Sequence, residues 1–380
     1  MSKGNFGGEG RLKRLSIAPV FHLCYHLTRR VLGGKIMEAG YVYDRIYLEH
    51  DTGTHPENSE RLVSIMSLLE RSGLKEQLVS LSPRMATDGE LMTIHSQEHI
   101  MQVESSSARG GAWLDGDTFA SRASYKAALY AAGGLLRGVD GVLNGEVNSA
   151  FALVRPPGHH ATRERAMGFC LFNNVAIAAR YAQQQHGLKR ILIVDFDVHH
   201  GNGTQDAFYE DPDVLYFSSH LYPYYPGSGD VDETGKGAGK GTTINVPLPG
   251  GCGDKEYHQV YEEILVPAAR RFQPDMILVS AGYDTHWADQ LAMMQLSVQG
   301  FADIVRIIKN LADELCDGRL VFTLEGGYNL EAISQGVKAT FEVLLDKAVT
   351  DDPLGEPRHG ARAPSIEHLM ERIKEIHQIG

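Results

Sequence analysis

Residues 190–203 read RILIVDFDVHHGNG, and this stretch decides the fold class. It opens with Ile191 to Val194, a short apolar run of the kind that forms a strand buried on both faces. Similar runs lie at 148–158, 213–220, 243–249, 274–284 and 319–328. Helical patterns lie at 59–73, 121–137, 172–186, 254–272, 298–316 and after 329. This alternation predicts a three-layer α/β protein, in which helices flank a mostly parallel β-sheet.

The composition is that of an ordinary globular protein. The chain has 380 residues, of which 43% are hydrophobic and 22% charged, enough for one large domain or two smaller ones. Its four cysteines stand far apart and form no CxxC pair, which argues against disulfides and a thiolate zinc site and predicts a reducing, cytoplasmic location. No apolar run reaches the roughly 18 residues that a membrane span needs, so no membrane partner is expected. The net charge of −12 also argues against direct binding of nucleic acid.

Polar side chains follow the apolar run that opens the quoted stretch. Asp195, Asp197 and His199 recur every second residue, so they lean to one side of an extended chain. Asp197 and His199 can ligate one metal ion, with Asp195 behind them as an acceptor that orients the site. By itself this pattern fits a capped strand end in a turn equally well. Asp284, which follows another apolar run, can supply a third ligand, and two Asp and one His with an open position suit a catalytic zinc ion.

Two more strand ends carry candidate catalytic residues. His159 and His160 follow a Pro-Pro-Gly turn, and neighbouring imidazoles suit general base and general acid work. A metal site or a solvated loop are the alternatives. Tyr328 follows two glycines that allow a tight turn and expose its phenol, which can donate to a developing oxyanion, unless it is only a packed loop residue. Because ligands bind outside the carboxyl ends of strands in α/β sheets, these strand ends together indicate one site.

Taken together, these motifs resemble the histone deacetylase family of the arginase–deacetylase fold. The resemblance runs from about Tyr41 to about Ala348. It lies in HDTGTHPENSERL (50–62), RPPGHHA (155–161), GFCLFNN (168–174), DFDVHHGNGTQ (195–205), YYPGSG (224–229), SAGYDTH (280–286) and LEGGY (324–328). Asn202 stands where class I members have Asp, so the chain is most similar to class II members and to the bacterial histone deacetylase-like amidohydrolases and acetylpolyamine amidohydrolases.

The resemblance implies a role for each motif residue. It implies one zinc ion per chain, held by Asp197, His199 and Asp284. It implies a catalytic group in which Asp195 is the partner of the first histidine and Asn202 of the second; the group consists of His159, His160, Tyr328, Asp195 and Asn202. It also implies a structural potassium ion below the zinc, held partly by main-chain carbonyls of Asp195, Asp197, His199, Ser218 and Ser219.

The resemblance also implies a tunnel for an acyl-lysine side chain. Its glycine floor and two aromatic walls match Gly168, Phe169 and Tyr225, although Phe is commoner than Tyr on the second wall. Leu291 matches the rim residue, which is acidic in the polyamine-selective eukaryotic member. Bacterial acetylpolyamine hydrolases select by other loops, so acetylated lysine peptides and acetylated polyamines both stay open as substrates. Asp117, or else Asp115, matches the rim aspartate that holds the substrate backbone.

The implied function is hydrolysis of an acetyl-amide to acetate and a free amine by metal-activated water. One alternative is an arginase-like ureohydrolase with two manganese ions. That site needs a further carboxylate two residues after the strand-end histidine, where this chain has Gly201. The other alternative is a non-catalytic acyl-lysine binding module. Such a module is expected to have lost a metal ligand or Tyr328, and all of these residues are present.

The two ends of the chain differ from its body. Residues 1–36 carry seven Lys or Arg and one Glu, a balance of +6 that leaves −18 on the rest. This composition is typical of an organelle transit peptide, but also of an unstructured extension or of sequence upstream of a working start at Met37. We favour either of the last two over the transit peptide. We expect a basic extension at 1–40, one catalytic domain at 41–348, and a linker with an amphipathic C-terminal helix at 349–380. Whether the chain forms a homo-oligomer stays open.

Overall fold

A computed structural model describes residues 1–2, 4, 38–349, 352–357 and 364–379. The basic extension predicted at 1–40 therefore lies almost wholly outside the described residues. From Glu38 onward the chain forms one unit, which holds every motif named above.

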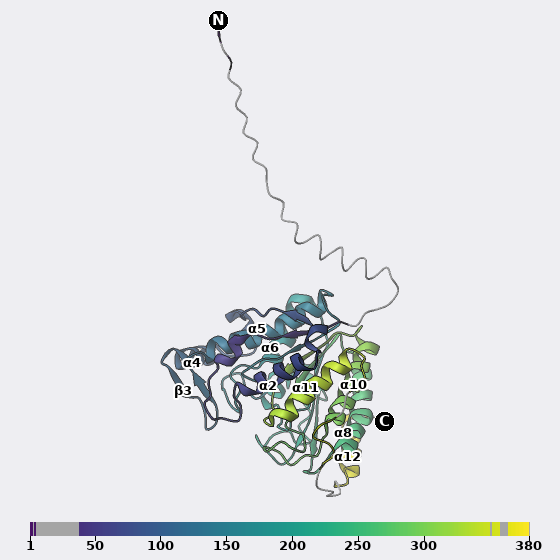
Figure 1. The fold of residues 1–380 in the computed structure, drawn as a ribbon. Coiled ribbons are helices and arrows are strands. Elements are labelled where there is room, and N and C mark those ends of the chain that lie inside the picture. The colour runs from purple at the N-terminus through teal and green to yellow at the C-terminus, as the bar shows by residue number, and fades with distance from the viewer. Residues whose placement is uncertain (3, 5–37, 350–351, 358–363, 380) are drawn as a thin grey trace. The chain divides into compact units, whose positions relative to one another are not determined.

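Eight parallel strands form the central sheet, in the order β2-β1-β5-β10-β9-β6-β7-β8 (Figure 1). Their bounds are β1 Ala39–Val42, β2 Val79–Leu81, β5 Ser149–Ala152, β6 Ile191–Asp195, β7 Val214–Leu221, β8 Thr243–Leu248, β9 Met276–Ala281 and β10 Leu320–Leu324. The central strands are buried at every residue, which explains why their sequences are continuous apolar runs rather than alternating ones. All six predicted strands are confirmed. Strand β7 begins and ends one residue later than expected, and its pairing with β8 continues to Leu221.

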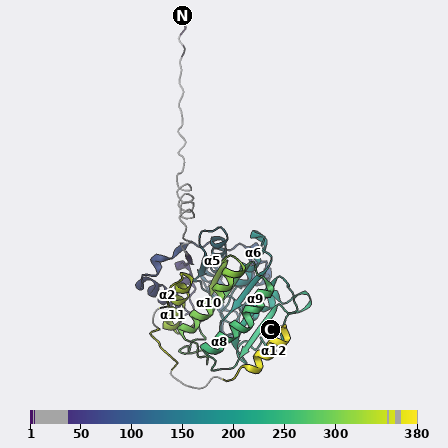
Figure 2. The same ribbon diagram turned by 90° about the vertical axis from the view of Figure 1, so that its right-hand side faces the viewer.

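Helices cover both faces of the sheet, so the predicted three-layer α/β fold is confirmed. The α-helices are α2 Glu60–Arg71, α3 Asp88–Leu91, α4 Gln97–Ala108, α5 Ser124–Leu143, α6 Asn174–His186, α7 Asn202–Phe208, α8 Asp254–Val260, α9 Val266–Phe272, α10 Val298–Leu315, α11 Leu330–Leu344 and α12 Glu367–His377. Helix α5 packs on α6 and on β1, β5 and β10, whereas α10 packs on α11 and α8, and α11 on α2. Figure 2 shows α8, α10 and α11 together on one face. No helix among the described residues is long and apolar enough to cross a membrane.

Helix α5 extends past the predicted end at residue 137, because its glycines are packing sites rather than helix breaks. A Cβ at Gly133 would lie 2.1 Å from the main-chain oxygen of Arg84. At Gly138 it would lie 3.2 Å from Val321 Cγ1 on strand β10. The helix therefore tolerates the conformational cost of these glycines in order to approach its neighbours closely.

Two parts of the fold bear on later arguments. A short antiparallel hairpin of β3 (Gly111–Trp113) and β4 (Phe119–Ser121) was not predicted, and it carries Asp115 and Asp117 in its turn. The predicted C-terminal helix is present as α12, which contacts β8. Its residues Met370 and Ile373 are buried against the core.

We expect a chain that begins at Met37 to fold and to keep its activity. The first strand starts at Ala39 and pairs with β2 and β5, so the sheet is formed by residues that the shorter chain keeps. The thermal unfolding temperature should match that of the full chain within about 2 °C, since surface changes usually cost less than about 0.5 kcal/mol. An insoluble or inactive truncated chain would show that residues 1–36 support the domain.

Candidate active site

A cavity of about 190 Å³ lies where the carboxyl ends of the central strands meet the loops that follow them. Its lining consists of Asp117, Pro157, His159, His160, Gly168, Phe169, His199, Tyr224, Tyr225, Leu291, Gly326 and Tyr328. The structure thus brings together the histidine pair, Tyr328 and all five residues predicted to contact substrate. The sequence analysis did not identify Pro157, Tyr224 or Gly326, although all three lie inside the quoted motifs.

Three ligand-type side chains converge beside this cavity. Asp197, His199 and Asp284 each offer an atom within 4.8 Å of the other two, and all three groups are buried or nearly so. Asp197 Oδ2 accepts the main-chain N–H of Gly326 at 2.7 Å, and Asp284 Oδ1 accepts that of Val198 at 3.0 Å. Asp284 Oδ2 is buried and accepts no hydrogen bond, although it lies 3.2 Å from His199 Nδ1. A buried carboxylate oxygen without a donor fits a cation at this point.

The electrostatics of this group favour a bound cation. Burial and the charge of Asp197 raise the pKa of Asp284 to about 7, although the neighbouring His199 acts in the opposite direction. Burial lowers the pKa of His199, but the two carboxylates outweigh burial and bring it to about 10. Two negative groups so close together are stabilised when a positive charge lies between them.

The histidine pair has two unlike partners. The rings of His159 and His160 lie 4.0 Å apart, centroid to centroid. His159 Nδ1 donates to Asp195 Oδ2 at 3.0 Å, whereas His160 Nδ1 donates to Asn202 Oδ1 at 2.9 Å. Because Nδ1 makes each of these bonds, Nε2 of each ring stays available for proton transfer. His159 Nε2 lies 3.9 Å from Asp197 Oδ1.

The unlike partners separate the two pKa values. Burial lowers the pKa of His159, but the charges of Asp195 and Asp197 outweigh burial and raise it to about 10. Burial and the charge of His159 hold the pKa of His160 well below its usual value. At neutral pH His159 is therefore a protonated imidazolium, whereas His160 is a neutral imidazole that can accept a proton.

Tyr328 lines the cavity but is only 8% exposed, less than its Gly-Gly turn suggested. A Cβ at Gly326 would lie 2.2 Å from Asp284 Oδ2, so the glycine lets the chain pass directly beside the candidate ligands. Gly327 adopts φ 115°, a conformation that L side chains rarely adopt. Burial and the charge of Asp284 raise the pKa of the Tyr328 phenol well above its usual value, so the hydroxyl stays a donor.

Aromatic rings form the walls of the cavity. Phe169 lies edge-on to Tyr328 at 5.8 Å, and Tyr225 lies edge-on to His160 at 5.1 Å. Gly168 is required because a Cβ there would lie 2.3 Å from His160 Cδ2. Tyr224 stacks on His199 at 5.5 Å, and its hydroxyl donates to the Leu291 carbonyl at 2.6 Å.

Ser218 and Ser219 lie on β7, where Ser218 is in register with Asp195 of the neighbouring strand. The Ser218 hydroxyl bonds His220 Nδ1 at 2.9 Å, and the Ser219 hydroxyl bonds the Tyr261 hydroxyl at 3.1 Å. These hydroxyls are thus engaged within the protein. A hydroxyl that donates its hydrogen keeps lone pairs for a cation, so both hydroxyl and main-chain oxygens stay available here, and the potassium site stays a prediction.

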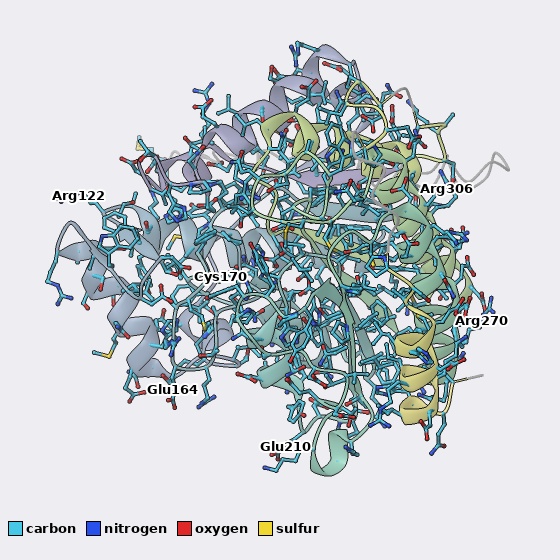
Figure 3. All side chains as sticks on the ribbon, turned by 90° about the horizontal axis from the view of Figure 1, so that it is seen from below. Arg122, Glu164, Cys170, Glu210, Arg270 and Arg306 are labelled. Carbon is cyan, nitrogen blue, oxygen red and sulfur yellow. The ribbon has the colours of Figure 1, made fainter. Side chains whose placement is uncertain are left out.

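A second buried group joins His159, Cys170 and Glu325 within 4.8 Å, and sequence analysis assigned no role to its glutamate. Glu325 accepts the main-chain N–H of Gly158 at 2.7 Å and that of His159 at 3.2 Å. It also accepts the Ser280 hydroxyl at 3.0 Å. Figure 3 shows Cys170 inside the molecule, with the labelled charged side chains at its periphery. We infer that Glu325 holds the loop of the histidine pair in place.

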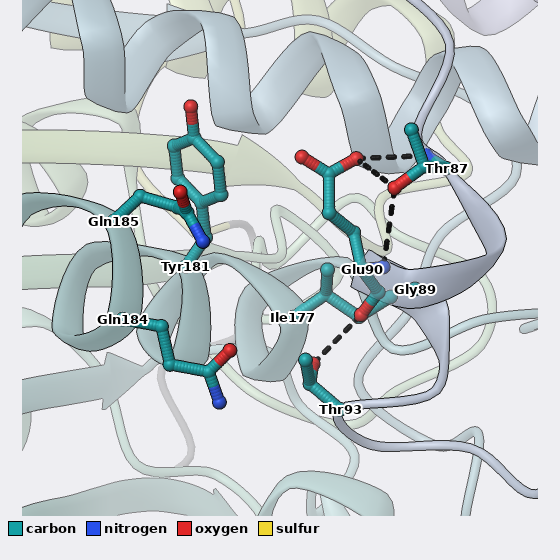
Figure 4. A pocket seen from close by; sticks show the side chains of 8 residues that line it. All are labelled: Thr87, Gly89, Glu90, Thr93, Ile177, Tyr181, Gln184 and Gln185. Atoms are coloured by element: carbon teal, nitrogen blue, oxygen red, sulfur yellow. Dashed lines mark hydrogen bonds between the residues drawn. The ribbon is translucent and has the colours of Figure 1, made fainter.

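A larger cavity, of about 400 Å³, lies between α3 and α6 (Figure 4). Its carboxylate, Glu90, is already bonded to Thr87 and forms an ion pair with Arg84. The cavity holds none of the candidate ligand groups found among the described residues. The chemistry therefore belongs to the smaller cavity.

Comparison with known proteins agrees with this geometry. A family model described as "Histone deacetylase domain" matches residues 55–344. Histone deacetylase 14, chloroplastic, of Arabidopsis thaliana is 44% identical over 349 residues, covering 87% of this chain and 82% of that protein. A probable deacetylase of Archaeoglobus fulgidus is 43% identical, covering 90% and 98%. The crystal structure of the HDA15 HD domain is 36% identical with a TM-score of 0.81, covering 90% of this chain and 94% of that one.

Proposed function

This chain belongs to the histone deacetylase family, and from this premise we propose that it is a zinc-dependent amidohydrolase that removes acetyl groups from lysine side chains. The family membership makes it a deacetylase. The observation that supports the zinc chemistry is the convergence of Asp197, His199 and Asp284 beside two histidines with unlike partners.

The donor set fits zinc. Two carboxylates and one imidazole are ligand types of catalytic zinc sites, which use three protein ligands and leave one position open. Zinc held by these residues supplies a Lewis acid for the acetyl carbonyl and lowers the pKa of the attacking water toward about 7.

The histidine pair moves the protons. Burial and the charge of His159 lower the pKa of His160, so its imidazole is neutral at neutral pH and is available to accept a proton from the attacking water. His159 stays protonated and is held by Asp195, so its positive charge stabilises the developing negative charge. When the carbon–nitrogen bond breaks, the pair returns a proton to the leaving amine. The products are acetate and a free amine.

Tyr328 faces the same cavity and, with its phenol protonated, donates to the oxygen that becomes negative in the transition state. The rings of Phe169 and Tyr225 contact the aliphatic stem of the substrate, and Asp117 and Leu291 lie among the residues that meet the rest of it. We also propose a structural potassium ion held by Asp195, Asp197, His199, Ser218 and Ser219, partly through main-chain carbonyls; Ser218 is in register with Asp195 on the neighbouring strand.

The two alternatives have less support. A Cβ at Gly201 would lie 2.3 Å from Asp195 Oδ2, so this position has no room for the carboxylate that a second metal ion requires. A non-catalytic binding module needs neither the histidine pair nor Tyr328, yet all three line the cavity. The direct test is acetate release from an acetyl-lysine peptide by the purified protein. Zinc bound in the same sample without acetate release would favour the binding module.

We expect acetyl-lysine peptides to be better substrates than acetylputrescine or acetylspermidine. Leu291 lines the mouth of the cavity and offers no charge to a second ammonium group. Leu291→Glu should shift the ratio of kcat/KM values toward the polyamines by about 1 kcal/mol, or about fivefold, as a partly exposed ion pair does.

Leu291→Gln is the matched control, because it changes size and polarity in the same way without adding charge. The measurement is kcat/KM for both substrate classes in all three proteins. A wild-type protein that prefers acetylpolyamines tenfold would overturn the peptide preference and leave the metal chemistry untouched.

A further inference from the structure

A buried carboxylate that no step above uses lies between the rim of the cavity and Tyr328. Asp289 is 5% exposed and belongs to the loop that follows β9. Its Oδ2 accepts the main-chain N–H of Tyr328 at 2.7 Å and that of Asn329 at 2.8 Å. Its Oδ1 accepts the main-chain N–H of Leu291 at 3.0 Å. One carboxylate therefore joins the rim residue to the candidate oxyanion donor.

Asn329 forms a second link between the same two segments. Its Nδ2 donates to the Ala288 carbonyl at 3.0 Å. Its Oδ1 accepts the main-chain N–H groups of Glu331 at 3.1 Å and Ala332 at 3.0 Å, which caps helix α11. Segments 288–291 and 328–329 are thus held together by two side chains: Asp289 bonds the main chain of the second segment, and Asn329 bonds the main chain of the first. Helix α11, which packs on α2 and α10, anchors the pair to the body of the protein.

We propose that Asp289 is a positioning residue for the reaction, which with Asn329 fixes the main chain of Tyr328 relative to the rim. The proposal rests on the proposed function of Tyr328. A hydroxyl that donates to the transition state must not be tied down by another partner, so the placement of the phenol depends on its backbone and on ring packing. The Tyr328 ring packs against Phe169, with 5.8 Å between ring centres, and against Arg61, whose Cζ lies 5.2 Å from the centre of the Tyr328 ring. Asp289 holds the main chain of Tyr328 in place through its hydrogen bond to the Tyr328 N–H.

The alternative is that Asp289 only stabilises the loop. Three N–H groups bonded to one buried carboxylate would stabilise any loop, because a buried N–H group that loses its partner destabilises the folded state. Only a positioning role, however, makes the effect of Asp289 depend on the Tyr328 hydroxyl.

The test is a double-mutant cycle with Asp289→Asn and Tyr328→Phe, in the full-length zinc-loaded protein with an acetyl-lysine peptide. Asp289→Asn keeps the size of the side chain, but its amide must turn an NH2 group toward at least one N–H donor. We expect kcat to fall about tenfold to a hundredfold with KM changed less than about threefold, since a displaced catalytic group costs up to about 10². In the Tyr328→Phe background the same substitution should change kcat less than about twofold.

Two further variants separate positioning from loop stability. Asn329→Ser keeps the helix cap but loses the bond to Ala288, so it should show a smaller loss of kcat with the same dependence on Tyr328. Asp254 is the matched control, because it accepts the Ser297 N–H at 2.8 Å and the Ser297 hydroxyl at 2.6 Å where helices α8 and α10 begin. Asp254→Asn should lower the thermal unfolding temperature without lowering kcat.

Equal fold losses from Asp289→Asn in both backgrounds, or no loss in either, would overturn the positioning role. A Tyr328→Phe protein with full kcat would overturn the oxyanion role in the proposed function, and the positioning role with it. The two failures are therefore distinguishable within one set of measurements.

Discussion

Replacing Tyr328 with Phe is expected to lower kcat for deacetylation by about 10²–10³, the usual effect of removing one oxyanion donor. The ring lines the cavity beside the candidate metal ligands, and the high pKa of the phenol keeps its proton available for donation. KM should change little, because the hydroxyl meets a charge that develops only in the transition state. The measurement is steady-state kinetics with an acetyl-lysine peptide, together with zinc content.

Tyr47→Phe is the matched control for this variant. Tyr47 is fully buried, and its hydroxyl donates to the Tyr130 carbonyl at 3.1 Å in another part of the fold. Its loss should lower the free energy of unfolding by about 1 kcal/mol and leave kcat unchanged. A Tyr328→Phe protein with near-normal turnover would reduce Tyr328 to a packed loop residue.

Replacing Asp284 with Ala is expected to empty the metal site and to abolish turnover. Asp284 supplies one of the three candidate ligands in this group, and its buried Oδ2 accepts no hydrogen bond. The wild-type protein should contain one zinc ion per chain by elemental analysis, and the variant should contain less than about a tenth of that.

Thermal unfolding gives a second measure of the same site. A ligand that binds only the folded state stabilises it, so a chelator should lower the unfolding temperature of the wild-type protein. The same chelator should leave Asp284→Ala unchanged, because that variant has no metal ion to lose. Two manganese ions per chain in an active wild-type protein would contradict the deacetylase chemistry and favour the ureohydrolase.

Local sequence predicted the strands well, because a strand buried on both faces must be apolar throughout. The runs around Ile191 and Met276 show this plainly. It predicted the end of α5 less well, because Gly138 and Gly141 look like breaks until their close neighbours are known. The hairpin β3–β4 was missed because each strand has only three residues, too few for a period to show.

Sequence also determined which residue types are available for chemistry. Spacing placed Asp197 and His199 on one side of the chain, and motif order indicated that Asp284, the histidine pair and Tyr328 belong with them. These inferences work because side chains at the carboxyl ends of neighbouring parallel strands meet at one edge of the sheet. Strand order and pairing then bring β5, β10, β9 and β6 side by side, so that the four strand ends become one cavity.

Only the tertiary structure decided how these groups act on one another. The pKa values of His159 and His160 diverge because burial and the Asp195 charge act at distances of a few ångströms, which no spacing along the chain encodes. Asp289 and Glu325 look like ordinary loop acids in the sequence. Each becomes a buried acceptor for several N–H groups only when segments far apart in the chain are folded together. A buried carboxylate is stable only with such partners, and the partners come from elsewhere in the chain.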